Sequence, residues 1–177
     1  YAVLYFNNSW EWSGGYGQYL EWAGDGKALL PSVDGYENYV AHVSRFVKNE
    51  KAKQLYYDHV RNIVSRVNTV TGRPYTEDPT IFSWQIGNEP RAFARDSLTK
   101  ASFADWMCSS AALIKSLDSN HMVSTGSEGL YGCEVDMSLF EKIHADSNFD
   151  YLNIHIWPLV WRWVDKDTFA DSVHLAT

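Results

Sequence analysis

Cysteine is scarce in this sequence, with Cys108 and Cys133 as the two residues of this type. Two cysteines do not make the disulfide framework of a small secreted domain, and no metal-ligand spacing surrounds them. The six histidines are scattered and form neither H-x-H nor H-E-x-x-H, which argues against a metal-dependent hydrolase. Whether the two thiols are free or paired stays open at this point.

Basic residues are also few, with 15 Lys and Arg against 22 Asp and Glu and a net charge of −7. This balance argues against nucleic acid or an anionic membrane as a partner, because both bind clustered positive charge. No apolar run approaches the roughly 18 residues of a membrane span, and no signal peptide is visible. No G-x-G-x-x-G or Walker sequence is present, which argues against a nucleotide-binding fold.

Neither end of the chain carries a clear boundary signal. The first residues, "YAVLYFNN", resemble a strand with no turn or cap before it, and the last, "DTFADSVHLAT", resemble the opening of a helix. We therefore expect truncation at both ends, and the missing signal peptide carries little weight.

Aromatic residues, by contrast, are abundant, with eight Trp and eleven Tyr. A large core accounts for many of them. Several, however, lie in a glycine-containing segment, residues 9–32, which we expect to be a long loop. Loops of this length inside a compact domain are usually functional.

Short apolar segments alternate with helical patterns along the chain. The apolar segments are rich in β-branched and aromatic residues, which predicts strands. Apolar residues at spacings of three and four predict the helices between them. This alternation is typical of a parallel α/β sheet, and we expect one domain over residues 1–177. The predicted strands are 2–8, 80–90, 122–129 and 151–158, and the predicted helices are 49–68, 98–118 and 138–145.

Polar residues gather where the predicted strands end, which is where parallel α/β folds place their sites. Alternation places Phe82, Trp84 and Ile86 under the helices and Glu89 on the opposite face, and Pro90 ends the strand. The same alternation in 151–157 directs inward Tyr151, Asn153, His155 and Trp157, and outward Leu152, Ile154 and Ile156.

Glu89 and His155 are therefore expected to face one cavity, beside Asn88. Two structural alternatives stay open: an ion pair of Glu89 with Arg91 or Arg95, and a core role for His155.

Four segments in order, "LYFNNSWEWSGGYGQYLEWAG", "SWQIGNEPRAF", "STGSEG" and "LNIHIWP", resemble glycoside hydrolase family 5, and within it bacterial β-mannanases. The resemblance covers nearly the whole chain. It implies part of a TIM (β/α)8 barrel, about strands 3–6, from the central portion of a catalytic domain. It also implies a secreted or periplasmic endo-β-1,4-mannanase without a cofactor or metal, acting on mannan, galactomannan or glucomannan.

The resemblance assigns roles to individual positions. Glu89 would be the general acid/base, Asn88 would bind the sugar 2-hydroxyl, and His155 would line the same subsite. Trp157 would stand there where many relatives have Tyr. The residues implied in substrate binding are Trp10, Trp12, Arg91, Glu128, Trp157 and Trp161.

A retaining glycosidase also needs a carboxylate nucleophile, which the resemblance places on a strand beyond Thr177. Glu128 stays open as an alternative nucleophile, and the 177 residues alone are expected to be inactive. The missing strands, or self-association, would cover the exposed sheet edges. Two other functions remain: a β-1,4-glucanase, and a non-catalytic carbohydrate-binding piece if no second carboxylate reaches Glu89.

Overall fold

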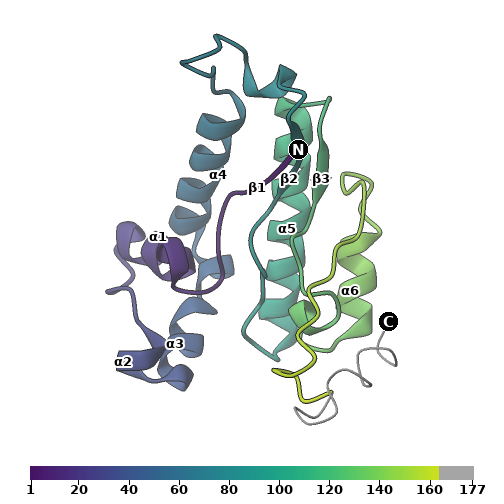
Figure 1. Cartoon of the computed structure of the whole chain (residues 1–177). Helices are drawn as coiled ribbons and strands as arrows, with labels where there is room; N and C mark the ends of the chain where they lie inside the picture. Colours follow the sequence, from purple (N-terminus) through teal and green to yellow (C-terminus); the bar gives the residue numbers. More distant parts are fainter. Residues whose placement is uncertain (164–177) are drawn as a thin grey trace.

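The computed structural model describes residues 1–163 as a three-stranded parallel sheet with helices packed along it (Figure 1). None of the described helices is long and apolar enough to cross a membrane. The elements, in chain order, are β1 (Ala2–Tyr5), η1 (Trp12–Gly14), α1 (Gly15–Ala23), α2 (Pro31–Asp34), α3 (Tyr36–Val43), η2 (Phe46–Lys48), α4 (Glu50–Val64), η3 (Tyr75–Glu77), β2 (Ile81–Gln85), α5 (Ser97–Leu117), β3 (Met122–Ser124), η4 (Tyr131–Cys133) and α6 (Met137–His144).

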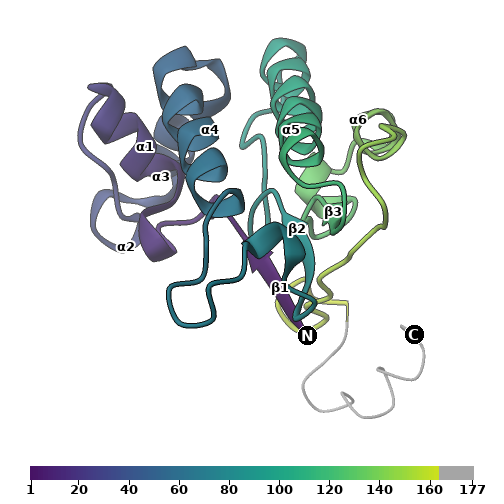
Figure 2. The same cartoon turned by 90° about the horizontal axis from the view of Figure 1, so that it is seen from above.

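The sheet has the order β1-β2-β3, and both pairs of neighbours run parallel. The long crossover helices α4 and α5 lie on one side of the strands (Figure 2). Parallel neighbours need such crossovers, which confirms the predicted alternation. The three strands are shorter than predicted, so the polar residues that follow them lie in loops at the carboxyl edge of the sheet.

The three predicted helices are confirmed, and side chains set their first turns. Asn49 accepts a hydrogen bond from the backbone N–H of Ala52 at the start of α4, and Asp96 accepts one from Thr99 at the start of α5. Asp136 does the same for α6. Each cap satisfies a backbone donor that the helix leaves free, which explains why the helices begin there.

The prediction of a loop over residues 9–32 was wrong, because α1 lies inside it and α2 begins near its end. Tyr16, Tyr19 and Leu20 are buried on one face of α1, at spacings of three and four. Burial of this face stabilises a helix despite Gly15 and Gly17, whose intrinsic helix propensity is poor.

The prediction that Phe82 packs under the helices was also wrong. The register between β1 and β2 shifts by one residue between Ala2 and Val3, so Phe82 is an extra residue on β2. A bulge interrupts the alternation of side chains. Phe82 is consequently exposed on the other face beside Tyr151, whereas Trp84 and Ile86 are fully buried.

Residues 151–158, predicted as a fourth strand, form no strand, and residue 158 already lies in a turn. No backbone hydrogen bond joins residues 151–158 to β3; the backbone N–H of Asp150, just before this segment, donates to the carbonyl of Val123. The Asn153 side chain accepts from the N–H of Gly126 and donates to the carbonyl of Ser127. Side-chain hydrogen bonds thus replace the ladder, and the predicted alternation persists: Leu152, Ile154 and Ile156 are exposed.

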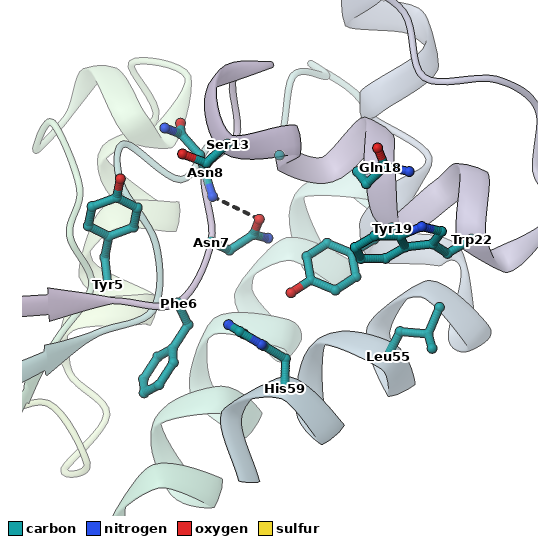
Figure 3. Close-up of a pocket in the computed structure, with 11 residues that line it drawn as sticks. Tyr5, Phe6, Asn7, Asn8, Ser13, Gln18, Tyr19, Trp22, Leu55 and His59 are labelled. Carbon is teal, nitrogen blue, oxygen red and sulfur yellow. Dashed lines mark hydrogen bonds between the residues drawn. The ribbon is translucent and has the colours of Figure 1, made fainter. Parts of the chain in front are cut away.

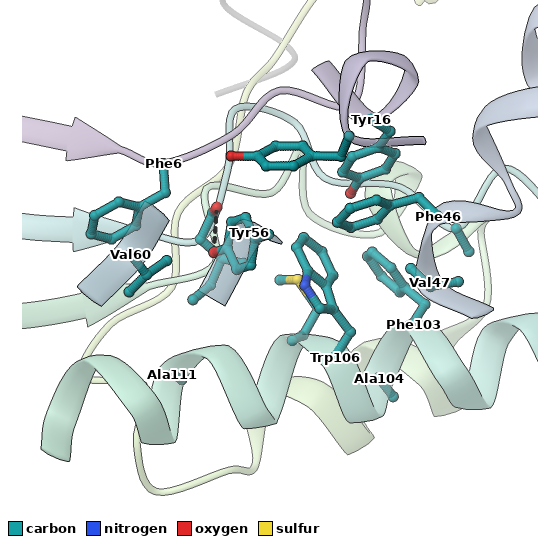
Figure 4. Packing of buried hydrophobic residues seen from close by; sticks show 14 of the residues in the cluster. Phe6, Tyr16, Phe46, Val47, Tyr56, Val60, Phe103, Ala104, Trp106 and Ala111 are labelled. Atoms are coloured by element: carbon teal, nitrogen blue, oxygen red, sulfur yellow. Dashed lines mark hydrogen bonds between the residues drawn. The ribbon is translucent and has the colours of Figure 1, made fainter. Parts of the chain in front are cut away.

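Aromatic residues from α1, η2, α4 and α5 form the centre of the core (Figure 4). Tyr16 stacks on Phe46 with ring centroids 4.4 Å apart, and both rings meet Trp106 edge-on. Tyr56 packs against Trp106 and donates its hydroxyl proton to the carbonyl of Ile86, just after β2. Much of the aromatic content therefore supports the sheet rather than the site.

Cys108 and Cys133 are both free thiols in the structure, which answers the question that the sequence left open. Burial raises the pKa of Cys108 to about 11 and that of Cys133 to about 12. Both groups therefore stay protonated near neutral pH, and neither has the reactivity of a catalytic thiolate.

A buried carboxylate, Asp118, joins the end of α5 to the middle of the sheet. Its side chain is fully buried and accepts hydrogen bonds from Trp84 Nε1 (2.8 Å) and His121 Nδ1 (2.7 Å). Its other oxygen accepts from the backbone N–H groups of Asn120 and His121. Burial raises the pKa of Asp118, but these hydrogen bonds outweigh it and hold the pKa below its ordinary value.

We expect Asp118→Asn to lower the free energy of unfolding by about 2–3 kcal/mol, because an amide cannot accept all of these bonds. Since the folded pKa is depressed, the contribution of Asp118 is complete at neutral pH and is lost as the pH falls below about 4. Urea unfolding at pH 7 and pH 3 measures both effects. Asp105→Asn is the control, because the Asp105 side chain is 73% exposed; equal losses for the two variants would contradict this account.

Candidate active site

The loop after β2 is held on both sides by the neighbouring strand ends. The backbone N–H of Asn88 donates to the carbonyl of Asn7 (2.7 Å), and that of Glu89 donates to the carbonyl of Gly126 (2.9 Å). Glu89 has a φ of +50°, a conformation that residues other than glycine seldom adopt. Such strain persists only where the surroundings impose it, and it occurs often at functional sites.

Three side chains surround the Glu89 carboxyl group, which is 8% exposed as a residue. Its Oε1 atom lies 2.9 Å from His155 Nδ1 and accepts a hydrogen bond from Trp157 Nε1 (3.0 Å). Its Oε2 atom accepts from Trp10 Nε1 (3.2 Å). The predicted pairing of Glu89 and His155 at one cavity is therefore present, and neither structural alternative holds.

Glu89 lies in an open cleft of about 810 Å³ at the carboxyl edge of the sheet. All nine residues that the sequence nominated line this cleft, so the structure brings them together; their individual roles stay predictions. Glu11, Tyr36, Tyr131 and Val160 also line it and were not nominated. Tyr36 and Tyr131 lie in helical segments of the loops, where spacing alone does not separate a site residue from a core residue.

Arg91 pairs with Glu128 rather than with Glu89. Its Nε atom lies 2.5 Å from Glu128 Oε2, and Glu128 is 3% exposed. Burial lowers the pKa of Arg91, but the hydrogen bond and charge of Glu128 outweigh it and raise the pKa. Glu128 is therefore paired with a cation and is a poor candidate nucleophile.

Near this pair, burial raises the pKa of Glu134, which accepts a hydrogen bond from the backbone N–H of Phe93.

We expect Arg91→Met to lower the free energy of unfolding by about 3–5 kcal/mol, because it leaves Glu128 buried and unpaired. The double variant Arg91→Met/Glu128→Leu should recover most of this loss, since no charge then remains buried. Urea unfolding of the wild type, both single variants and the double variant forms a double-mutant cycle. Additive losses in the cycle would contradict the pairing.

Aromatic rings line the walls and rim of the cleft. Trp12 is 59% exposed and Trp157 is 50% exposed. Trp161 stacks on Tyr131 with ring centroids 4.3 Å apart and planes within 10°. Trp163 extends this group by donating its indole N–H to the hydroxyl of Tyr131. Exposed aromatic faces beside a carboxylic acid suit an uncharged ligand with C–H faces, such as a pyranose ring.

A second cleft, of about 440 Å³, lies beside β1 and α1 (Figure 3). Tyr5, Asn7, Trp22 and His59 are among the residues that line it, and its lining includes no carboxylate. In residues 1–163, no cluster of His, Cys, Asp and Glu could hold a metal ion. Of these two clefts, the one that contains Glu89 is therefore the one that combines carboxylates with a histidine.

Comparison with known proteins identifies relatives over the whole chain. Residues 1–177 match the model of a family described as GH family 5 beta-mannosidase-like. Mannan endo-1,4-beta-mannosidase 1 from Arabidopsis thaliana is 34% identical over 96% of this chain and 42% of its own length. Mannan endo-1,4-beta-mannosidase 4 from Oryza sativa subsp. japonica is 34% identical over 92% of this chain and 35% of its own length. The chain thus spans less than half the length of these relatives.

Solved structures show the same likeness. A mutant of the glycoside hydrolase family 5 mannosidase from Rhizomucor miehei, in complex with mannosyl-fructose, matches with a TM-score of 0.77 and 35% identity. The match covers 93% of this chain and 38% of that one. The endo-beta-1,4-mannanase from Thermotoga petrophila matches with a TM-score of 0.71 and 27% identity, over 90% of this chain and 34% of that one. That the chain resembles bacterial mannanases more closely than others stays a prediction, because the two sequence relatives above are plant proteins.

Proposed function

The chain belongs to the GH family 5 beta-mannosidase-like family, and on this basis we propose that it carries the acid/base side of an active site that hydrolyses β-1,4-linked mannan with retention of configuration. Its parallel strands and helices are part of the (β/α)8 barrel of this family. The observation that carries the proposal is the buried Glu89 carboxyl group, which has N–H donors around it and an aromatic cleft in front of it.

Glu89 acts twice in the proposed reaction. As a carboxylic acid, it protonates the glycosidic oxygen while the nucleophile forms a bond to the anomeric carbon and the leaving sugar departs. As a carboxylate, it then takes a proton from the water that releases the glycosyl group from the enzyme. Retaining enzymes keep the two carboxyl groups about 5–5.5 Å apart, which sets where the nucleophile must lie.

The nucleophile is proposed to come from outside the described residues. Besides Glu89, the carboxylates that line the cleft within residues 1–163 are Glu11 and Glu128. Glu128 forms an ion pair with Arg91. Glu11 lies directly before Trp12, in the loop between β1 and α1. A further barrel strand beside this open cleft is proposed to deliver the carboxylate to Glu89.

The other groups of the cleft have proposed roles in substrate binding. Asn88 lines the cleft beside Glu89 and is proposed to bind the 2-hydroxyl of the sugar whose bond is cleaved. This contact strengthens in the transition state. Trp12 and Trp161 provide ring faces for neighbouring sugars, and Arg91 with Glu128 binds the sugar on the leaving-group side. Further barrel strands are the proposed partner of the open sheet edges, and the enzyme is proposed to act outside the cytoplasm.

The substrate class is tested by reducing-end release from soluble galactomannan and carboxymethylcellulose, with the natural polypeptide that contains these residues. We expect galactomannan to be preferred at least about fivefold, since one well-placed polar contact discriminates by about 1–3 kcal/mol. Preference for the cellulose derivative would make the protein a β-1,4-glucanase. Binding of mannohexaose without release of reducing ends from either polymer would leave a carbohydrate-binding function instead.

A further inference from the structure

We propose that Trp10 is a positioning residue for the general acid/base, holding the Oε2 atom of Glu89 through its indole N–H rather than stacking on a sugar. The inference rests on the proposed function, because positioning matters to a rate only if Glu89 transfers a proton. It gives Trp10 a role different from the sugar contact that the sequence resemblance implies.

The two oxygens of the Glu89 carboxyl group have different partners. Oε1 has two nitrogen atoms within 3.0 Å, those of His155 and Trp157. Oε2 has one, Trp10 Nε1, at 3.2 Å. Because Oε1 is already occupied by two partners, Oε2 is the oxygen free to carry the proton that passes to the glycosidic oxygen. Trp10 thus holds the oxygen that reacts.

The ring of Trp10 is occupied by protein on several sides. Tyr39 lies parallel to it, with planes within 6° and centroids 6.3 Å apart, and Phe93 meets it edge-on at 5.1 Å. The Arg91 guanidinium carbon lies 5.6 Å from the ring centroid, within the range of a cation–π contact. Trp12, which is well exposed, has more ring surface to offer a sugar.

The backbone that carries Trp10 is tied to the backbone of the acid/base loop. Asn8 and Asn88 form a parallel bridge, and the N–H of Ser9 donates to the carbonyl of Asn88. The Ser9 hydroxyl donates to the carbonyl of Glu89 itself. The Tyr39 hydroxyl donates to the carbonyl of Ser9 (2.7 Å) and so holds this segment from the other side. The indole is therefore anchored relative to Glu89 at both its ring and its backbone.

An indole N–H is well suited to this role because it only donates. It keeps its hydrogen bond to Oε2 whether Glu89 is protonated or ionised, so the carboxyl group does not rotate between the two steps of the reaction. A group that could also accept would offer the Glu89 proton an alternative partner. Tryptophan at position 10 therefore fixes geometry without competing for the proton.

Trp10→Phe in the natural polypeptide tests the proposal by kinetics. We expect kcat on galactomannan to fall by about 10–100-fold with KM changed by less than about threefold, because only proton transfer is impaired. An aryl β-mannoside with a good leaving group should be cleaved at its first step with little loss, because its departure needs no protonation. Trp22→Phe, which removes an indole that lines the second cleft and not the cleft of Glu89, is the matched control and should leave both rates unchanged.

A spectroscopic measurement on the natural polypeptide tests the contact without any turnover. In a ¹H–¹⁵N spectrum, the Trp10 indole signal, assigned by its loss in Trp10→Phe, should move in Glu89→Gln, because an amide replaces the carboxyl group that accepts its hydrogen bond. The indole signal of Trp22 should keep its position when the same two spectra are compared. A Trp10 signal unaffected by Glu89→Gln overturns the proposal.

The outcomes separate the inference from the function on which it rests. If Trp10→Phe raises KM for every substrate and lowers the rate equally for good and poor leaving groups, Trp10 is a sugar platform and the inference is overturned. If the wild type releases no reducing ends from mannan, the proposed function is overturned. In that case, the indole spectrum still decides whether Trp10 holds Glu89.

Discussion

Glu89→Gln is expected to lower kcat on galactomannan by about 10³-fold, within the range that a positioned general acid contributes. The glutamine side chain occupies the same volume but has no proton to give to the glycosidic oxygen. Substrates whose leaving groups need no proton should keep a fast first step, followed by slow release of the glycosyl group. Rates on galactomannan and on a dinitrophenyl β-mannoside, measured in parallel, check this split.

The control for Glu89→Gln is Glu141→Gln, because Glu141 lies exposed on α6 and should leave both rates unchanged. Folding is verified by the near-ultraviolet circular dichroism of the buried tryptophans. An equal decrease in rate on both substrates would mean that Glu89 does not act as the acid. A decrease in kcat of less than about threefold on galactomannan would mean that Glu89 takes no part in the reaction.

Gly126→Ala is expected to lower the free energy of unfolding by about 3 kcal/mol or more. Gly126 has a φ of +75°, and an added Cβ would overlap the carbonyl oxygen of Gly87. Left-handed backbone costs a residue with a side chain about 1–2 kcal/mol, and overpacking adds a comparable amount. Because the carbonyl of Gly126 accepts the N–H of Glu89, the substitution should also lower kcat. Urea unfolding and steady-state kinetics measure the two effects.

Gly72→Ala separates strain from overlap, because Gly72 has a φ of +70° and no atom lies near its missing Cβ. Gly72→Ala should lower the free energy of unfolding only by the about 1–2 kcal/mol that left-handed backbone costs a residue with a side chain, and it should leave kcat unchanged. If both glycine variants lose the same stability, the close approach of Gly87 and Gly126 does not hold the site, and the strain at Glu89 must have another cause.

The site was more predictable from the sequence than the elements around it. Glu89 follows β2 at the carboxyl edge of the sheet, and His155 lies in a segment that side-chain hydrogen bonds of Asn153 hold beside the end of β3, so the two residues meet at one edge. The alternation of exposed and partly buried side chains over 151–156 persists although the segment forms no strand.

The errors had local causes that sequence patterns do not reveal. Glycines in α1 hid a helix that tertiary packing of Tyr16, Tyr19 and Leu20 stabilises. A one-residue bulge beside Phe82 depends on how two strands align, and nothing in either strand alone specifies it. The contact of Trp10 with Glu89 joins residues that are 79 positions apart, so composition could nominate Trp10 for the site but not its hydrogen bond.

The assignment of Glu89 as the acid/base is tested most directly by azide rescue of Glu89→Ala, in the natural polypeptide that contains these residues. The variant is given an aryl β-mannoside with a good leaving group, with and without sodium azide, and the product is identified by NMR. In a retaining enzyme without its acid/base, azide attacks the glycosyl–enzyme intermediate in place of activated water. The account predicts faster turnover with azide and a β-mannosyl azide product. An α-mannosyl azide would identify Glu89 as the nucleophile instead, and no acceleration by azide would contradict its role as the general acid/base.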